Sequence, residues 1–138
     1  MEGQTNSERL LEEFKDIKIE EFDENRSRLS RGALYNLYLR LSVKPSAEWA
    51  QLFDQSRSFP RHTMWRKAWI EGKFIVIECV PEELKKYHLA DLKEDVTNAN
   101  GTYKEYLKRC IQKERESLRI RDDERQRLKS IKGSLDFD

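Results

Sequence analysis

Residues 64–80, MWRKAWIEGKFIVIECV, decide the fold that the sequence predicts. Two runs rich in aromatic and β-branched residues flank the dipeptide Glu71-Gly72, and a two-residue loop containing Gly favours a tight hairpin turn. With this dipeptide as the loop, Ile70 is expected to pair with Lys73. A one-residue shift of the turn changes the pairs but not the side chains that share a face. The less aliphatic face then holds Trp65, Lys67, Trp69, Phe74, Val76 and Glu78.

Two further strands are predicted before this hairpin. Residues 33–43 alternate apolar and mixed positions, which is typical of a strand with one side in the core. Residues 17–20 alternate in the same way and predict a short, half-buried strand. Residues 23–32 are polar, include three arginines and end in Gly32, so we interpret them as a connection.

Helices are predicted on both sides of the strands. Residues 7–13 are expected to form a short helix or a frayed end. A second helix should begin at Lys44-Pro45, with the proline at its first position, and end near Ser58. The last helix should begin at Pro81. From Leu89 its apolar residues follow steps of three and four, and these residues are Leu89, Leu92, Val96, Ala99, Tyr103, Tyr106 and Cys110.

The dipeptide Asn100-Gly101 conflicts with this regular spacing because it resembles the end of a helix. The chain therefore forms either two helices or one long helix, and the unbroken apolar spacing favours one. After Lys113 the sequence is almost saturated with charge, which predicts a solvated helix that frays from about Gly133.

These elements predict an α+β fold. The order β-β-α-β-β-α indicates an antiparallel sheet of about four strands, with helices on one face and a long charged C-terminal helix. We expect a polar N-terminal arm over residues 1–13 and a single α+β domain over residues 14–112. Residues 113–138 are expected to be a helical extension that ends in a disordered tail.

Charge is segregated along the chain although the total is nearly neutral. The 27 Lys and Arg and the 26 Asp and Glu leave a net charge of +1. Residues 1–25 sum to −6, residues 26–73 to +7, residues 74–99 to −3 and residues 100–138 to +3. We expect these blocks to neutralise one another in three dimensions. The alternative is that residues 26–73 present a basic surface.

Several classes of protein are excluded. An apolar run of about 18 residues would be needed to cross a membrane, and the sequence contains none. The polar start does not resemble a secretory signal, and two cysteines are too few for a disulfide scaffold. We therefore expect a cytoplasmic protein with no membrane association. Known phosphate-loop, zinc-protease and hydrolase motifs are also missing, so no cofactor is expected.

Metal-binding and catalytic residues are not singled out by the pattern. His88 and Asp91 stand at i, i+3 and could share a metal, but two ligands do not make a site, and Cys79 has no evident partner. No metal site is therefore predicted. Glu78 is the most unusual carboxylate because it interrupts an apolar strand, yet the solvent edge of its face explains it. A small enzyme with an unidentified carboxylate-based site is the least favoured class.

The aromatic face of the hairpin is the strongest candidate for a functional surface. We expect a small protein-binding or adaptor domain that acts through this face and through the C-terminal helix. The candidate partner-binding residues are Trp65, Lys67, Trp69, Phe74, Tyr38 and Arg40. The candidate self-association residues, which would form a dimer stripe, are Leu92, Val96, Tyr103, Tyr106 and Cys110.

Nucleic-acid binding by the basic block is the alternative function. Flat rings interleaved with cations on an open sheet can stack single-stranded bases. The phosphate contacts would come from Lys67, Arg66, Arg40, Arg57 and Arg61. A protein partner or a second copy of the chain is favoured over nucleic acid.

Overall fold

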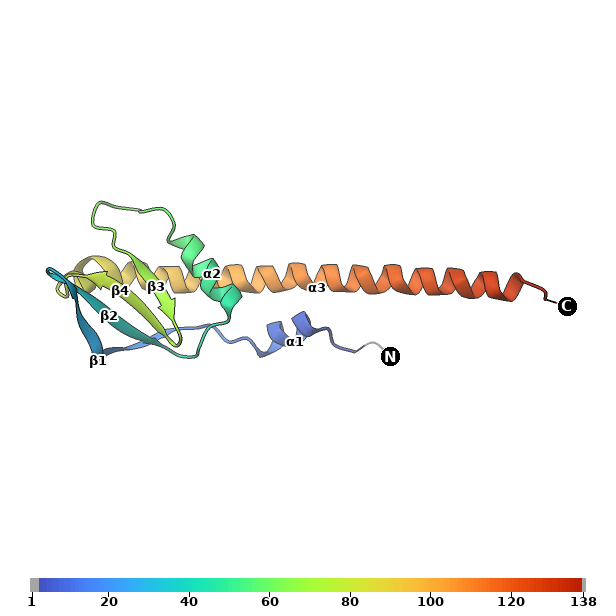
Figure 1. Cartoon of the computed structure of the whole chain (residues 1–138), viewed down its shortest axis with the longest axis horizontal. Coiled ribbons are helices and arrows are strands. Elements are labelled where there is room, and N and C mark those ends of the chain that lie inside the picture. Colours follow the sequence, from blue (N-terminus) through green and yellow to red (C-terminus); the bar gives the residue numbers. More distant parts are fainter. Residues whose placement is uncertain (1–2, 138) are drawn as a thin grey trace. The chain divides into compact units, whose positions relative to one another are not determined.

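The structure, a computed structural model, describes residues 3–137, and their helices and strands confirm the predicted α+β class (Figure 1). The four strands form one antiparallel sheet of order β1-β2-β4-β3. In chain order the elements are α1 (Asn6–Glu13), β1 (Ile19–Arg31), β2 (Leu34–Leu41), α2 (Ala47–Ser56), β3 (Ala68–Glu71), β4 (Phe74–Cys79), the π-helical segment η1 (Leu84–His88) and α3 (Leu89–Ser134).

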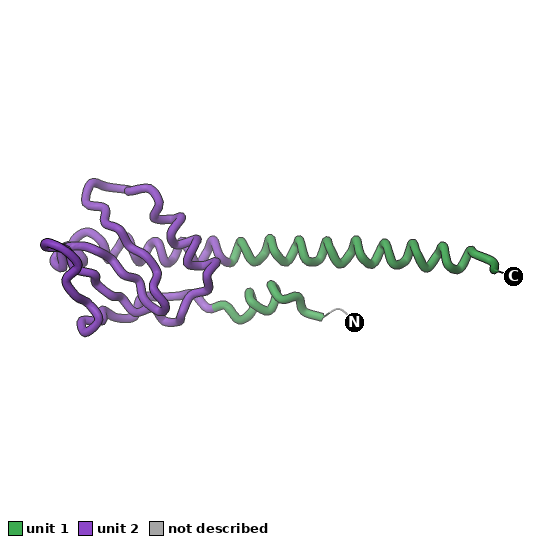
Figure 2. Tube along the Cα trace, in the orientation of Figure 1, with its two compact units in different colours: residues 1–14, 104–138 green, residues 15–103 purple. Residues whose placement is uncertain are grey.

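The chain divides into two compact units, shown in different colours in Figure 2. Residues 15–103 hold the sheet, α2, η1 and the beginning of α3. Residues up to 14 and from 104 onward make the other unit, which contains α1 and the remainder of α3. No helix among the described residues has a stretch long and apolar enough to cross a bilayer.

The core of the sheet unit lies between one face of the sheet and the two helices α2 and α3 (Figure 1). Alternate residues of β2 and β4 point to this face because side chains alternate along a strand. Trp49 and Phe53, one helical turn apart on α2, are both fully buried, and their rings stack with centroids 5.8 Å apart. Other buried residues of this core include Leu37, Leu39, Leu41, Ile75, Ile77, Cys79, Leu92, Val96 and Ala99.

The hairpin forms as predicted, but its turn lies one residue further along the chain, so each pairing shifts by two residues. Ile70 pairs with Ile75 and Glu71 pairs with Phe74, so the loop is Gly72-Lys73 and the expected pairing of Ile70 with Lys73 is wrong. Gly72 has a φ of +59°, and among the described residues only glycines have a positive φ. Glycine at the first loop position, with an ordinary φ at the second, is the pattern of a type II′ turn. The shift leaves the composition of each face unchanged.

The first strand is much longer than the sequence suggested. β1 continues through residues 23–31, so the polar segment 23–32 was wrongly interpreted as a connection. Its pairing to β2 is interrupted between Asp23 and Arg28, where the chain bulges. The Ser27 hydroxyl holds this bulge: it accepts from the Tyr38 amide at 3.0 Å and donates to the Asp23 carbonyl at 2.8 Å. An edge strand exposed on both sides shows no hydrophobic alternation, so the pattern was uninformative here.

The beginning of α2 also differs from the prediction. The Ser46 hydroxyl accepts a hydrogen bond from the Trp49 amide at 3.2 Å, which makes Ser46 the N-cap and Ala47 the first helical residue. Pro45 therefore precedes the cap and does not occupy the first helical position.

α3 is one helix that passes through Asn100-Gly101, as the apolar spacing favoured. Asn100 is buried because it links three segments and not because it caps a helix. Its Oδ1 accepts from the Ile17 amide and from Trp49 Nε1, each at 3.0 Å, and its Nδ2 donates to the Ile17 carbonyl at 2.9 Å. Asn100 thus connects the chain before β1 to α2 and α3. The helix continues to Ser134, just beyond the expected fraying point.

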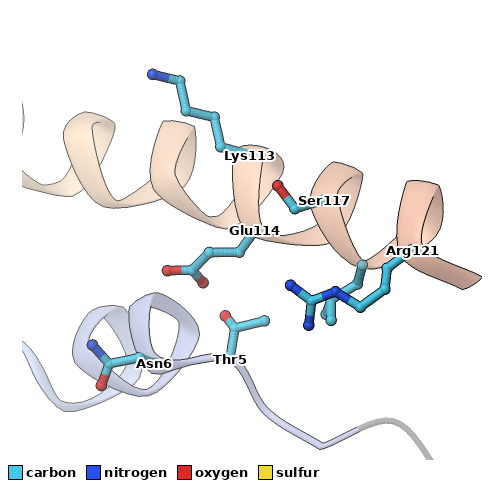
Figure 3. Close-up of a pocket in the computed structure, with 7 residues that line it drawn as sticks. Thr5, Asn6, Lys113, Glu114, Ser117 and Arg121 are labelled. Atoms are coloured by element: carbon cyan, nitrogen blue, oxygen red, sulfur yellow. The ribbon is translucent and has the colours of Figure 1, made fainter.

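The second unit joins α1 to the later part of α3. The Thr5 hydroxyl caps α1 by accepting from the Glu8 amide at 3.1 Å. The Ser7 hydroxyl donates to the carboxylate of Glu114, and Arg115 forms an ion pair of 2.6 Å with Glu8. Figure 3 shows Glu114 directed at the start of α1. Hydrogen bonds from Ser7 and Thr5 lower the pKa of the Glu114 carboxyl.

Candidate functional site

The loop between α2 and β3, residues 57–67, is anchored at its base by one buried carboxylate. Asp95 on α3 has no exposed side-chain surface and accepts from Arg57 Nη1 at 2.6 Å and from Arg61 Nη2 at 2.8 Å. The Ser56 hydroxyl donates to the same carboxylate at 2.9 Å. A buried charge requires such partners. Asp95 therefore holds Arg57 and Arg61 in place, and these two arginines fix the first part of the loop.

Trp65 completes this anchor. The Arg57 guanidinium carbon lies 4.1 Å from the Trp65 ring centroid, and that of Arg61 lies 4.7 Å from it. Arg57 also donates through Nη2 to the Arg66 carbonyl at 2.9 Å. Burial lowers the pKa of Arg57, and the hydrogen bond to Asp95 opposes that change. The loop is thus held at several points by charge-assisted hydrogen bonds and by stacking.

Phe59 lies between the two anchored arginines and points outward. Its side chain is 81% exposed, so the ring gains little stability from the hydrophobic effect. The sequence indicated Phe59 and Pro60 only as the end of a helix. Two arginines close to Phe59 in the sequence were the one available signal of an anchored loop. The carboxylate that binds both of them is far away along the chain.

The predicted aromatic face is present on the strands and is partly covered by the chain itself. Trp69, Phe74 and Tyr38 come from β3, β4 and β2, and the rings of Tyr38 and Phe74 meet edge to face at 5.8 Å. Tyr38 is only 4% exposed, and its hydroxyl donates to Glu71 at 3.1 Å. Arg26, from the β1 bulge, lies 4.5 Å from the Phe74 ring centroid. Trp69 and Phe74 are half-buried, and Tyr38 is buried with its ring against that of Phe74.

Trp65 lies outside the strand that was predicted to contain it, because β3 begins only at Ala68. A surface cavity of about 300 Å³ nevertheless brings Trp65 and Trp69 together with Lys67, whose ammonium nitrogen lies 5.6 Å from the Trp69 ring centroid. The residues that line this cavity are Asp54, Arg57, Trp65, Arg66, Lys67, Ala68 and Trp69.

The charge blocks meet one another in the fold. Arg40 lies 3.5 Å from Glu20 and 3.3 Å from Glu21 of the acidic first block. Arg66 binds both carboxylate oxygens of Glu83, at 3.1 and 3.2 Å. Arg57 and Arg61 bind Asp95. Five basic residues were considered for phosphate contacts, and the four arginines among them therefore bind carboxylates. Lys67 is the fifth residue of that set.

The proposed self-association stripe is divided between two environments. Leu92, Val96 and Tyr103 are 0%, 3% and 6% exposed, because they pack within the sheet unit's own core. They offer no surface to a second copy of the chain in this conformation. Tyr106 and Cys110 are partly exposed.

A second cluster was missed by the sequence analysis. The ligand atoms of Cys79, Glu83 and His88 all lie within 4.8 Å of one another, and Cys79 and His88 are buried. Burial raises the pKa of the Cys79 thiol to about 11 and lowers that of the His88 imidazole, whereas hydrogen bonds from Arg66 lower the pKa of Glu83. Asp91, the expected partner of His88, instead lies 2.7 Å from His62 Nε2.

Glu78 has an ordinary structural environment. The Ser30 hydroxyl donates to it at 2.8 Å, and Arg31 lies 3.3 Å away. The hydrogen bond from Ser30, helped by Arg31, lowers the pKa of the Glu78 carboxyl. A general acid at neutral pH needs its pKa raised, so this environment does not favour that role.

No protein-family model, curated protein or solved structure matches this chain.

Proposed function

We propose that this chain is a protein-binding module whose contact surface is formed by Phe59, Trp65, Lys67 and Trp69. The observation behind the proposal is the relation of Phe59 to its anchors. An 81% exposed aromatic side chain stands between Arg57 and Arg61, which are both bound to the buried Asp95.

An exposed aromatic residue on an anchored loop suits a protein interface. Binding energy in such interfaces is concentrated in a few anchors, among which aromatic residues and arginine are enriched. A loop that is already ordered loses less conformational entropy when it binds. The partner we propose is a folded protein with an apolar pocket that receives Phe59.

The ion pairs favour a protein partner over nucleic acid. Affinity for a polyanion depends on cations that can replace its counterions. Arg40, Arg57, Arg61 and Arg66 instead bind Glu20, Glu21, Asp95 and Glu83 within the fold. Breaking these pairs would reduce the gain from each phosphate contact. A role as a cytoplasmic adaptor remains part of the proposal.

The test compares matched phenylalanine variants. Wild-type protein, Phe59→Ala and Phe137→Ala would each be immobilised, and proteins captured from a lysate of the source cells would be quantified by mass spectrometry. Phe137 is 87% exposed and lies outside the loop, which makes it a control for general stickiness. A protein lost only with Phe59→Ala would then be purified and titrated by calorimetry.

We expect Phe59→Ala to weaken that purified complex at least about tenfold, the size of an interface hot spot, and Phe137→Ala to leave it unchanged. Equal affinity of all three proteins would overturn the proposal. Labelled single-stranded and duplex oligonucleotides test the nucleic-acid alternative. Tight binding that falls steeply with salt and is lost in Lys67→Ala would favour that alternative and overturn the proposal.

A further inference from the structure

Three potential metal ligands of different chemistry meet where β4 leads into α3. Cys79 Sγ, a Glu83 carboxylate oxygen and a His88 ring nitrogen all lie within 4.8 Å of one another. Cys79 is fully buried, His88 is 1% exposed, and the Glu83 side chain is 14% exposed. His88 Nε2 lies 3.5 Å from Glu83 Oε1. Buried polar side chains in proteins nearly always have a bonding partner, and a metal ion bound by all three groups would supply one.

The local backbone is built to bring these residues together. Cys79 ends β4, and the Glu83 amide donates to the Val80 carbonyl at 2.9 Å, which closes a turn around Pro81. The segment η1 is then π-helical, with the Leu89 amide bonded to the Leu84 carbonyl. π-Helical turns are rare and frequently occur at functional sites. The wider turn sets the position of His88, five residues after Glu83, relative to the end of β4.

We propose that Cys79, Glu83 and His88 bind a zinc ion. A thiolate, an imidazole and a carboxylate form a ligand set that zinc accepts, whereas calcium and magnesium require oxygen ligands. Three protein ligands leave the fourth tetrahedral position for water or another small ligand. Zinc–ligand bonds of about 2.0–2.3 Å place neighbouring ligand atoms about 3.5 Å apart. The observed cluster needs only a small contraction to reach this spacing.

Arg66 would act as a positioning residue for the site. Its Nε and Nη2 contact both Glu83 oxygens, so the guanidinium fixes the plane of the carboxylate. Groups that orient metal ligands in this way commonly affect the affinity for the metal. Binding breaks the S–H bond of Cys79 and forms a zinc–sulfur bond, and the proton passes to the buffer. His88 then carries its own proton on Nδ1 if Nε2 is the ligand.

The test uses the full chain after treatment with a chelator and a reductant. Titration with Zn²⁺ by calorimetry should give one ion per chain and a proton release that shows as a dependence of the measured heat on the buffer. Cys110 provides the matched control, since the chain has only two cysteines. Cys110→Ser should bind zinc like the wild type, whereas Cys79→Ser, Glu83→Gln and His88→Gln should each bind at least about tenfold more weakly.

Cobalt substitution keeps the test decisive if a core variant fails to fold. Co²⁺ added to Cys110→Ser, in which Cys79 is the remaining thiol, should give a thiolate-to-cobalt charge-transfer band and strong tetrahedral d–d absorption. Absence of that band in the folded protein would overturn the proposal. So would equal zinc affinity of wild-type and Cys79→Ser protein. Phe59→Ala should bind zinc normally, which separates this site from the proposed protein-binding surface.

Discussion

Arg57 and Asp95 form an ion pair that is almost closed to solvent. Arg57 Nη1 lies 2.6 Å from Asp95 Oδ2, and the two side chains are 5% and 0% exposed. The pair joins the end of α2 to α3, and Arg61 shares the same carboxylate at 2.8 Å. Each charge is tolerated in the interior because the other is present.

Removal of the Asp95 charge should therefore be strongly destabilising. Asp95→Asn keeps the size of the side chain but leaves the buried Arg57 without a counter-charge, so we expect a loss of about 3–5 kcal/mol in the free energy of unfolding. Urea denaturation followed by circular dichroism measures this loss. Glu105→Gln removes one partner of the exposed pair with Lys108 and should change the unfolding midpoint very little. Similar midpoints for both variants would contradict the anchoring role of Asp95.

The same substitution should affect the stability of the protein very differently at two phenylalanines. Phe53 is fully buried, so Phe53→Ala should cost about 3–5 kcal/mol. Phe59 is 81% exposed, and Phe59→Ala should change stability by no more than about 0.5 kcal/mol. Thermal and urea unfolding of both variants check this contrast. A large loss for Phe59→Ala would mean that its ring packs inside the protein.

Asn100 should be far more important than its helical neighbour Asn98. Asn100→Ala leaves the Ile17 amide and carbonyl and Trp49 Nε1 without their hydrogen-bond partner, and we expect a loss of at least about 2 kcal/mol. Asn98 is exposed, and alanine there should be neutral or slightly stabilising. The comparison is made by urea denaturation, and equal effects at the two positions would refute the linking role of Asn100.

Gly101 should be replaceable with a gain in stability. It lies within α3, and a Cβ built there would meet nothing within 4 Å. Gly101→Ala should stabilise the protein by about 0.5–1 kcal/mol because alanine loses less backbone entropy in a helix. A rise in melting temperature is the expected readout. Destabilisation would show that the helix needs glycine at this point.

The contact between α1 and Glu114 should weaken in acid. Hydrogen bonds from Ser7 and Thr5 lower the pKa of Glu114 in the folded protein. A lowered folded-state pKa stabilises the contact above the unfolded value of about 4.3, and this stabilisation is lost as the pH falls through the folded value. NMR titration of the Glu114 carboxyl carbon should show the lowered pKa, and Ser7→Ala should move it upward. An unchanged midpoint in Ser7→Ala would contradict the assignment.

The sequence predicted the elements that are governed by local periodicity. Alternation in β2 and β4 and the helical spacing of Trp49 and Phe53 reflect burial on one face, which leaves a clear pattern in the chain. β1 was predicted too short because an exposed edge strand is polar on both sides. Gly72 was placed second in its turn because glycine suits either loop position.

The candidate sites depended on contacts between distant residues and were only partly predictable. Trp69 and Phe74 share the predicted face because alternation alone determines it. Asp95, which anchors the loop, lies 38 residues from Arg57 along the chain, and nothing in its local sequence indicates a buried carboxylate. The meeting of Cys79 and His88 requires a turn and a π-helical segment, which hydrophobic patterns do not specify.

The two edges of the sheet restrict how other chains can associate with it. β3, at one edge, has only four residues, and β1, at the other, bulges between Asp23 and Arg28 and is largely charged. Short, bulged and charged edge strands oppose the addition of a foreign strand, and they protect natural sheets from forming fibrils. The edges of this sheet therefore oppose aggregation by backbone pairing between strands. Recognition of other molecules then depends on side chains.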